Sequence, residues 1–459
     1  MSAEKTVTMA MDGTASHADD RDASLCPSES RPNTSTGEPS QVVAGGQRHS
    51  IRYIEPIMAW LVSRIVCVMA MTLGAIFLPI ADRYDLTKDN PRAGVISDLS
   101  KYYQDYAQDP EAFGQRPMIG LTLGGPWSAV SPLIHWDTFW YLSIVEQGYV
   151  GQPGLKWQQN AVFFPVFPML VYLVTLTGVP AVVAGLIVAN VCALGAVCLL
   201  YGFLWKTEGA AVARWTIALW LTYPLAFFSV VPYTEAPVAL IQVLVLCLVH
   251  SGRYAWAGAC VGIAGGVRLP GILLGGPFVK ELFSRRWPMV LVGICLSLTG
   301  LLAFMGYLAW RFDDPLYFVT IQKNFRPAGV GLNPLLWILS IVKAALIPLI
   351  AMVQSEDPWP VLLSARGLDP YLAIIAIALL PAVFRWHWGW GLTCLATLIL
   401  PLTTGTVASL GRYLWVALPF FVVAGRGLPK SHWRWPMVVV SSLLLVISAF
   451  LFGGGWEMI

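Results

Sequence analysis

Long apolar runs separated by short polar segments make up the chain from about residue 51 onward. A helix needs about 20 mostly apolar residues to cross a bilayer. The pattern therefore predicts an all-α polytopic membrane protein with about nine full spans. The predicted spans are 57–80, 182–205, 210–230, 235–251, 287–310, 368–385, 388–405, 408–426 and 433–452.

Three further apolar stretches contain prolines or charges and are not typical spans. Residues 161–177 carry Pro165 and Pro168, residues 253–282 are broken at Arg268-Leu269-Pro270-Gly271, and residues 332–353 contain Lys343 and Pro348. We expect the first stretch to stay at the outer face, the second to form a shallow hairpin and the third to lie at the outer surface.

Lysine and arginine gather in the short loops between spans, and such loops face the cytoplasm in most membrane proteins. With the three interrupted stretches placed as above, every basic cluster falls on one side. The N-terminus is then inside, and 81–160 becomes a large first extracytoplasmic loop. The clusters are Arg48, Arg52 and Arg64; Lys206 and Arg214; Arg253; Lys280, Arg285 and Arg286; and Arg426, Lys430 and Arg434.

The first fifty residues differ from the rest. Residues 1–50 are rich in Ser, Thr, Gly, Pro, Asp and Glu and contain almost no apolar clusters. Such a composition cannot bury enough surface to fold. We expect a disordered cytoplasmic tail over 1–50 and a membrane domain over 51–459.

Composition narrows the class of protein. The chain of 459 residues is 56% hydrophobic and only 12% charged, with a mean hydropathy of +0.64. These values exclude a soluble domain of this size. The net charge of +3 is too small to indicate nucleic-acid binding. Seven of the eight cysteines lie in apolar stretches without metal-ligand spacing, so they indicate neither a disulfide framework nor a structural metal.

Charged groups close to the hydrocarbon are costly and therefore point to function. In the assigned topology one set falls at the outer ends of the spans, so several of its members should meet at one outward-facing site. The set comprises Asp137 and Glu146, Tyr233-Thr234-Glu235, Arg268, Asp313 and Asp314, and Arg412-Tyr413.

Each of these residues also has a structural interpretation. Histidines 135, 387 and 432 fit interfacial or structural roles better than catalytic ones. Among the acidic residues, Asp137 could cap the following helix, Glu235 could interact favourably with a helix dipole, and Asp314 could start a helix after a turn. Of the arginines, Arg268 could bind carbonyls freed by the proline break, and Arg412 could reach toward lipid headgroups.

Six short elements occur in a set order along residues 130–430. They are Trp136-Asp137 with Trp140-Tyr141-Leu142 and Gly148-Tyr149; Phe163-Phe164-Pro165-Val166-Phe167-Pro168; Tyr233-Thr234-Glu235; Arg268-Leu269-Pro270-Gly271; Asp314-Pro315-Leu316-Tyr317-Phe318 with Gln322; and Arg412-Tyr413 with Pro419. Together they resemble the PIG-V-type mannosyltransferases of the GT-C glycosyltransferase superfamily and their bacterial relatives. Two departures are a longer outer loop near 82–130 and an extra residue between Arg268 and Pro270.

The resemblance implies a GT-C-like bundle of about 9–11 transmembrane helices, in a bacterial plasma membrane, with the active site facing outward. It also implies transfer of a hexose, such as mannose, from a polyprenyl-phosphate donor to an acceptor glycan, lipid or protein, with inversion. No cofactor is expected, and a divalent metal stays open.

The chemistry of that reaction suggests roles for the residues. A carboxylate within hydrogen-bond reach can take the acceptor proton, which favours Asp137. The lipid phosphate that leaves needs fixed cations, which favours Arg412 and Arg268. The other expected contacts with substrate are Trp136, Trp140, Tyr141, Tyr233, Glu235, Asp314, Gln322 and Tyr413.

Two other functions fit the same pattern. Broken spans with internal Arg and Pro also occur in transporters, so a transporter or flippase of lipid-linked sugars is the main alternative, although the sequence has no clear internal repeat. A non-catalytic partner subunit on the same scaffold is the second. Convergence of Asp137, Glu235 and Arg412 on one outward cavity would favour the enzyme.

Overall fold

Helices account for nearly all regular structure in the part of the chain that the computed structural model describes, which is residues 41–78, 95–96, 122–123, 125–151, 159–325, 331–354 and 365–456. The all-α prediction is confirmed there. The sheet structure in these residues is one parallel pair of two-residue strands, β1 (Val95–Ile96) and β2 (Thr122–Leu123). Helix α1 (Gln41–Phe77) begins before the expected start at residue 51, and the rest of the expected tail lies outside the described residues.

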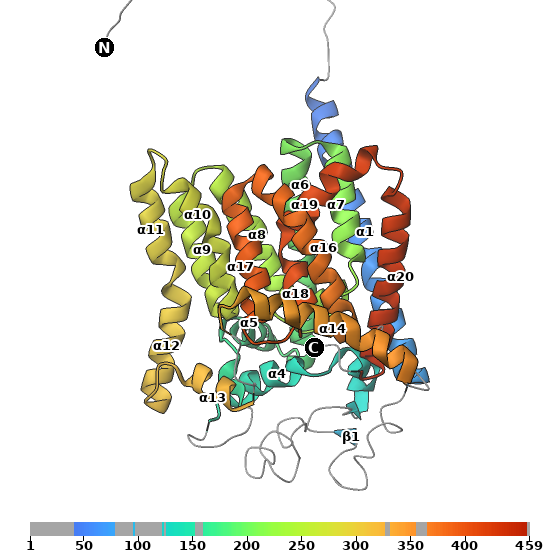
Figure 1. Cartoon of the computed structure of the whole chain (residues 1–459), viewed down its shortest axis with the longest axis vertical. Coiled ribbons are helices and arrows are strands. Elements are labelled where there is room, and N and C mark those ends of the chain that lie inside the picture. The colour runs from blue at the N-terminus through green and yellow to red at the C-terminus, as the bar shows by residue number, and fades with distance from the viewer. Residues whose placement is uncertain are drawn as a thin grey trace, which may run out of the picture. The chain divides into compact units, whose positions relative to one another are not determined.

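The helices of the unit His49–Ile459 form a bundle of roughly parallel rods (Figure 1). Within the described residues, five stretches are long and apolar enough to cross a membrane, which supports a multi-pass membrane protein. They are Tyr53–Phe77 of α1, α6 (Ala181–Thr207), Trp287–Phe312 containing α11 (Trp287–Ser297) and α12 (Thr299–Phe312), Gly367–Trp386 of α16 (Ala365–Trp386), and α20 (Arg434–Gly453).

Shorter apolar helices complete the bundle. They are α5 (Val166–Thr175), α7 (Ala210–Thr222), α8 (Glu235–His250), α9 (Tyr254–Val267), part of α14 (Pro334–Gln354), and α17 (Trp388–Leu402). Two predicted spans are broken. Residues 210–230 form α7 and the 3₁₀ helix η5 (Ala226–Ser229), because Pro224 cannot continue α7. Residues 408–426 divide into α18 (Leu410–Val416) and α19 (Leu418–Gly427) before Pro419.

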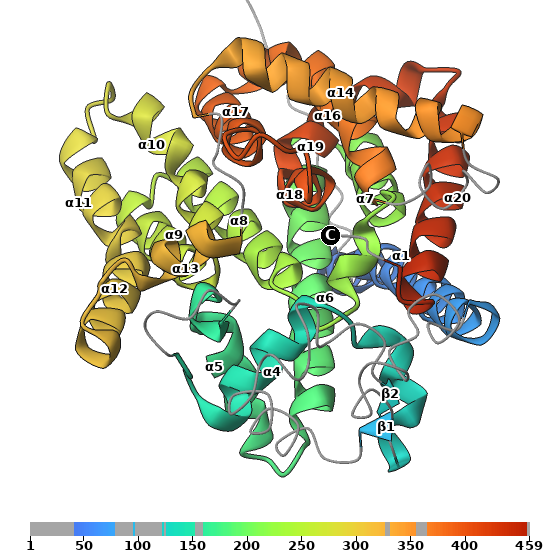
Figure 2. The ribbon, with the colours of Figure 1, turned by 60° about the horizontal axis from the view of Figure 1, so that its bottom comes forward.

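None of the three interrupted stretches forms one long straight helix along the bundle. Residues 161–177 form the short α5 after the 3₁₀ turn η4 (Asn160–Val162). Helix α9 turns at Arg268 into η6 (Leu269–Gly275) and α10 (Gly276–Glu281), a hairpin in which Gly271 lies against the Ala264 carbonyl. Helix α14 runs across the bundle rather than along it in both views (Figures 1 and 2).

The connections between helices sort to the two ends of the bundle. The turns α6–α7, α10–α11 and α19–α20, the last containing η7 (Leu428–Lys430), lie at the upper end in Figure 1. Helices α4 (Asp137–Gln147), which follows η3 (Gly125–Leu133), and α13 (Tyr317–Phe325) lie at the lower end. The basic loops therefore share one end, and the Trp-Asp element lies at the other.

Small residues bring α9 into close contact with α11 and α12. A Cβ atom added at Gly258 would collide with the Gly293 backbone, and one at Gly300 with the Gly262 carbonyl. Small residues allow this approach between membrane helices, where packing rather than hydrophobic transfer drives association. The glycines therefore fix the position of α9, which ends at Val267, just before Arg268.

We expect Gly258→Ala to destabilise the protein, because the added methyl group must push α9 and α11 apart. Overpacking of this kind costs about 1–3 kcal/mol. Gly306→Ala on α12 is the matched control, since its Cβ would meet nothing within 4 Å. Thermal unfolding in detergent, followed by tryptophan fluorescence, measures the difference. Equal melting temperatures for the two variants would contradict the close packing.

His135, just before α4, is buried rather than interfacial. Its ring contacts Phe452 of α20 edge-on, with centroids 5.2 Å apart. Burial lowers the pKa of His135 to about 4, although a hydrogen bond with the Gly453 backbone opposes this shift. The folded protein therefore holds a neutral imidazole that fastens the start of α4 to α20.

This depressed pKa makes stability depend on pH. The unfolded chain binds a proton at His135 below about pH 6.5, whereas the folded chain does so only near pH 4. The contribution of neutral His135 to the free energy of unfolding is therefore fully present above about pH 6.5, and it is lost as the pH falls toward 4. Between pH 7 and pH 5 the loss is about 2 kcal/mol. Unfolding of His135→Gln, measured at both pH values beside wild type, should show a correspondingly smaller loss, and parallel losses would refute the assignment.

Candidate active site

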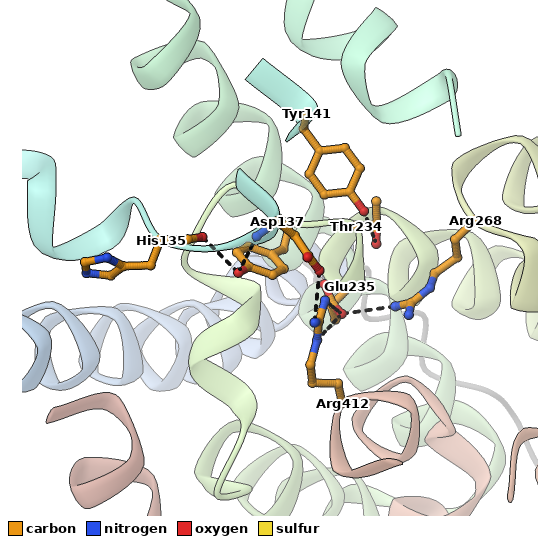
Figure 3. A network of polar contacts seen from close by, with 8 residues as sticks. His135, Asp137, Tyr141, Thr234, Glu235, Arg268 and Arg412 are labelled. Atoms are coloured by element: carbon orange, nitrogen blue, oxygen red, sulfur yellow. Dashed lines mark hydrogen bonds and ion pairs between the residues drawn. The ribbon is translucent and has the colours of Figure 1, made fainter. Parts of the chain in front are cut away.

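Four charged side chains from separate parts of the chain meet at the lower end of the bundle. Asp137 is the first residue of α4 and Glu235 the first residue of α8. Arg268 follows the last residue of α9, and Arg412 lies in α18. Figure 3 shows both guanidinium groups directed at the Glu235 carboxylate, with Asp137 above Arg412. The proximity of Asp137, Glu235 and Arg412 that the sequence led us to expect is present.

Glu235 is the centre of this network. Its Oε1 atom accepts hydrogen bonds from Arg412 Nε at 2.9 Å and Arg268 Nη1 at 3.0 Å, and lies 2.8 Å from Arg412 Nη2. Its side chain is 0% exposed. A carboxylate removed from water is tolerated only when it is paired and hydrogen-bonded, and the two arginines supply both conditions.

Arg412 is enclosed on every side. Its Nη1 donates to Asp137 Oδ2 at 3.1 Å while Nε and Nη2 face Glu235, so one guanidinium joins both carboxylates. The rings of Phe228 and Tyr233 lie 4.5 and 4.8 Å from its Cζ atom. Its side chain is only 4% exposed, so the alternative of an arginine reaching toward lipid is wrong.

Arg268 is the more accessible of the two arginines. Its side chain is 15% exposed and stacks 4.5 Å from the centre of the Tyr413 ring. Among the residues that the structure describes, its hydrogen bonds to protein come from Nη1 alone. The other N–H groups of its guanidinium are therefore available to a ligand.

The two carboxylates also differ in access. The Asp137 side chain is 21% exposed, whereas that of Glu235 is fully buried. Trp136 rather than Asp137 is the N-cap of α4, and among the described residues the Asp137 carboxylate accepts its hydrogen bond from Arg412, so the capping interpretation does not hold. Glu235 does lie in the first turn of α8, where it also favours the helix dipole. Asp137 is thus the carboxylate of this pair that a substrate can reach.

Two aromatic residues expected to contact the sugar lie in the core instead. Trp140 and Tyr141 are 8% and 5% exposed. Trp140 stacks on Phe163, and Tyr141 meets Phe163 and Phe167 edge-on. Burial, followed by the charge of Asp137, raises the pKa of Tyr141, and its hydroxyl lies 3.5 Å from Thr234 Oγ1. These rings pack α4 against α5 and the residues before it. Trp136 is half-buried.

The Asp314 element starts a helix, as its structural interpretation proposed. Asp314 Oδ1 accepts the Leu316 N–H at 2.8 Å, and Oδ2 accepts the Thr320 hydroxyl at 3.1 Å. Both bonds stabilise the start of α13. Gln322 lies half-buried on the same helix. The hydrogen bonds of Asp314 do not bring it into the Glu235 network.

One further carboxylate was missed at the sequence level. Asp369, on α16, is 0% exposed and accepts the Gly411 N–H at 2.8 Å, which places it against the N-terminus of α18. Ser409, which precedes α18, has a positive φ of 64°. Asp369 therefore supports the turn from which Arg412 projects. An acidic residue within the predicted span 368–385 was the available signal, by the rule that selected Glu235.

The described residues contain no group of three or more His, Cys, Asp or Glu placed to hold a metal ion. Each described cysteine is a free thiol.

Comparison with known proteins gives one informative similarity. No protein-family model matches the chain, and no solved structure matches it. The chain is 27% identical over 198 residues to GPI mannosyltransferase 2 of Yarrowia lipolytica, which covers 38% of this chain and 52% of that protein. The chain thus matches about half the length of this relative. The chain is similar, over part of its length, to a mannosyltransferase.

Proposed function

We propose that the protein is an integral membrane mannosyltransferase that moves a hexose from a polyprenyl-phosphate donor to an acceptor hydroxyl, with inversion at the anomeric carbon. The observation that carries the proposal is the Glu235 network at one end of a membrane bundle. In it Arg412 joins an accessible carboxylate, Asp137, to the buried Glu235, which also holds Arg268. The partial similarity to a GPI mannosyltransferase supports the same reaction class.

Asp137 is the general base in this proposal. The acceptor oxygen loses its proton to the Asp137 carboxylate as it bonds to the anomeric carbon, and the bond from that carbon to the phosphate oxygen breaks. One carboxylate oxygen is held by Arg412 at 3.1 Å, which fixes the orientation of the group. Glu235 is unsuited to the task because it is fully buried between two arginines.

Arg268 is the residue proposed to bind the leaving phosphate. The lipid phosphate gains charge as the glycosidic bond breaks, and aimed donors stabilise that charge. Arg268 has unused donors and partial exposure, whereas Arg412 uses its guanidinium to join Asp137 and Glu235. The sequence suggested the same phosphate-binding role for both arginines. In this proposal Arg268 keeps that role, and Arg412 organises the two carboxylates.

The membrane orientation follows from the basic loops. If those loops face the cytoplasm, the end of the bundle that carries the Glu235 network faces outward. A lipid-linked donor can reach such a site from the membrane, and a bacterial plasma membrane is the proposed location.

Asp137→Asn should lower turnover by roughly 10²-fold or more, because the amide preserves shape but cannot take a proton. The assay is incorporation of labelled mannose from synthetic polyprenyl-phosphate mannose into lipid and protein fractions. Glu208→Gln is the matched control, since Glu208 also pairs with an arginine, at 2.9 Å, and is 17% exposed. Full turnover by Asp137→Asn in folded protein would exclude Asp137 as the base.

The two arginines should respond differently to substitution by lysine. Arg268→Lys keeps a charge but loses the planar fork, so we expect a turnover loss of roughly 10²–10³-fold with little change in melting temperature, because Glu235 keeps Arg412. Arg412→Lys should also lower the melting temperature clearly, since breaking a buried pair costs about 3–5 kcal/mol. Both quantities are measured on one preparation. Undiminished turnover in Arg268→Lys would remove it from the phosphate site.

A further inference from the structure

The backbone immediately before Asp137 adopts a conformation that tryptophan rarely takes. Trp136 has φ 55° and ψ −120°, and the Thr138 N–H bonds to the His135 carbonyl at 3.3 Å. This is the geometry of a type II′ turn, whose first central position is normally glycine. Strained backbone of this kind persists only where its surroundings hold it in place, and it often occurs at functional sites.

One side chain holds this turn on both sides of Trp136. The Tyr233 hydroxyl donates to the His135 carbonyl at 2.9 Å and accepts the Asp137 N–H at 3.2 Å. Tyr233 is 0% exposed, so no water competes for these bonds. Its ring also lies 4.8 Å from the Arg412 guanidinium carbon. Tyr233 therefore touches the backbone of Asp137 and the arginine that orients the Asp137 carboxylate.

We propose that Tyr233 is a positioning residue for the reaction rather than a contact to the sugar. Its hydroxyl holds the strained turn at Trp136 so that the Asp137 carboxylate faces the acceptor. The proposal rests on the proposed role of Asp137 as the base. It explains why a tyrosine stands two residues before Glu235: the start of α8 then presents both the carboxylate that binds Arg412 and the hydroxyl that aims Asp137.

Tyr233→Phe tests this directly, because it removes the hydroxyl and keeps the ring over Arg412. A small displacement of a catalytic group can cost up to about 10²-fold in rate. We expect turnover to fall about 10-fold or more with an unchanged KM for the polyprenyl-phosphate mannose donor. Tyr201→Phe is the control for stability, since it also removes a buried hydroxyl, which there bonds to Glu55. Unchanged turnover in Tyr233→Phe would overturn the proposal.

A double-variant comparison separates positioning from a general loss of structure. If Tyr233 acts through Asp137, then Tyr233→Phe combined with Asp137→Asn should turn over as slowly as Asp137→Asn alone. A further proportional loss in the double variant would overturn the positioning role while leaving Asp137 as the base. Wild-type turnover in Asp137→Asn would instead refute the proposed base, and with it any role for Tyr233 through that residue.

A second background keeps the test decisive if Tyr233→Phe folds poorly. Trp136→Gly relieves the positive φ, since glycine adopts this conformation without steric cost. The loss caused by Tyr233→Phe should therefore be several-fold smaller in the Trp136→Gly background than in wild type. Equal losses in both backgrounds would show that the hydroxyl does not act on the turn, and would overturn the proposal.

Discussion

The buried carboxylate of Glu235 is the constraint on which the rest of the site depends. A fully buried charge is stable only with its partners in place, and both partners lie on other elements of the fold. Arg412 extends the same requirement to Asp137. Four elements are thereby held together by one set of ion pairs. Displacing any of them leaves an uncompensated charge in a membrane domain, where that cost is greatest.

The helix ends at the site stabilise these charges electrostatically. Asp137 and Glu235 are the first residues of α4 and α8, where the positive end of a helix dipole favours an anion. Arg268 directly follows the end of α9, where the negative end favours a cation. The break in residues 253–282 contributes to this arrangement. It ends α9 at Val267, so that Arg268 lies at a helix terminus beside the first residue of α8.

Much of this could be predicted from the sequence. Apolar run length located the five described stretches that are long enough to cross a membrane, whereas the other four predicted spans are shorter or broken. The rule that charges near hydrocarbon are functional selected Asp137, Glu235, Arg268 and Arg412. The ion pairs between these residues could not be predicted, because Arg412 and Asp137 are 275 positions apart and no local pattern encodes their contact. The same limit applies to Trp140 and Tyr141. An aromatic residue in a predicted loop can face a sugar or a neighbouring helix, and the burial of these two rings against Phe163 and Phe167 depends on the packing of α5.

The two arginines differ in their contacts, although they are the same type of residue. By residue type both suit a lipid phosphate, and no feature of the sequence separates them. Within the fold, Arg412 is saturated by carboxylates and covered by the rings of Phe228 and Tyr233, whereas Arg268 keeps free donors at a partly exposed edge. A saturated guanidinium can hold a base in place but cannot also follow a leaving group. The proposed reaction therefore uses the two arginines differently: Arg412 is committed to the carboxylates, and Arg268 is left for the substrate.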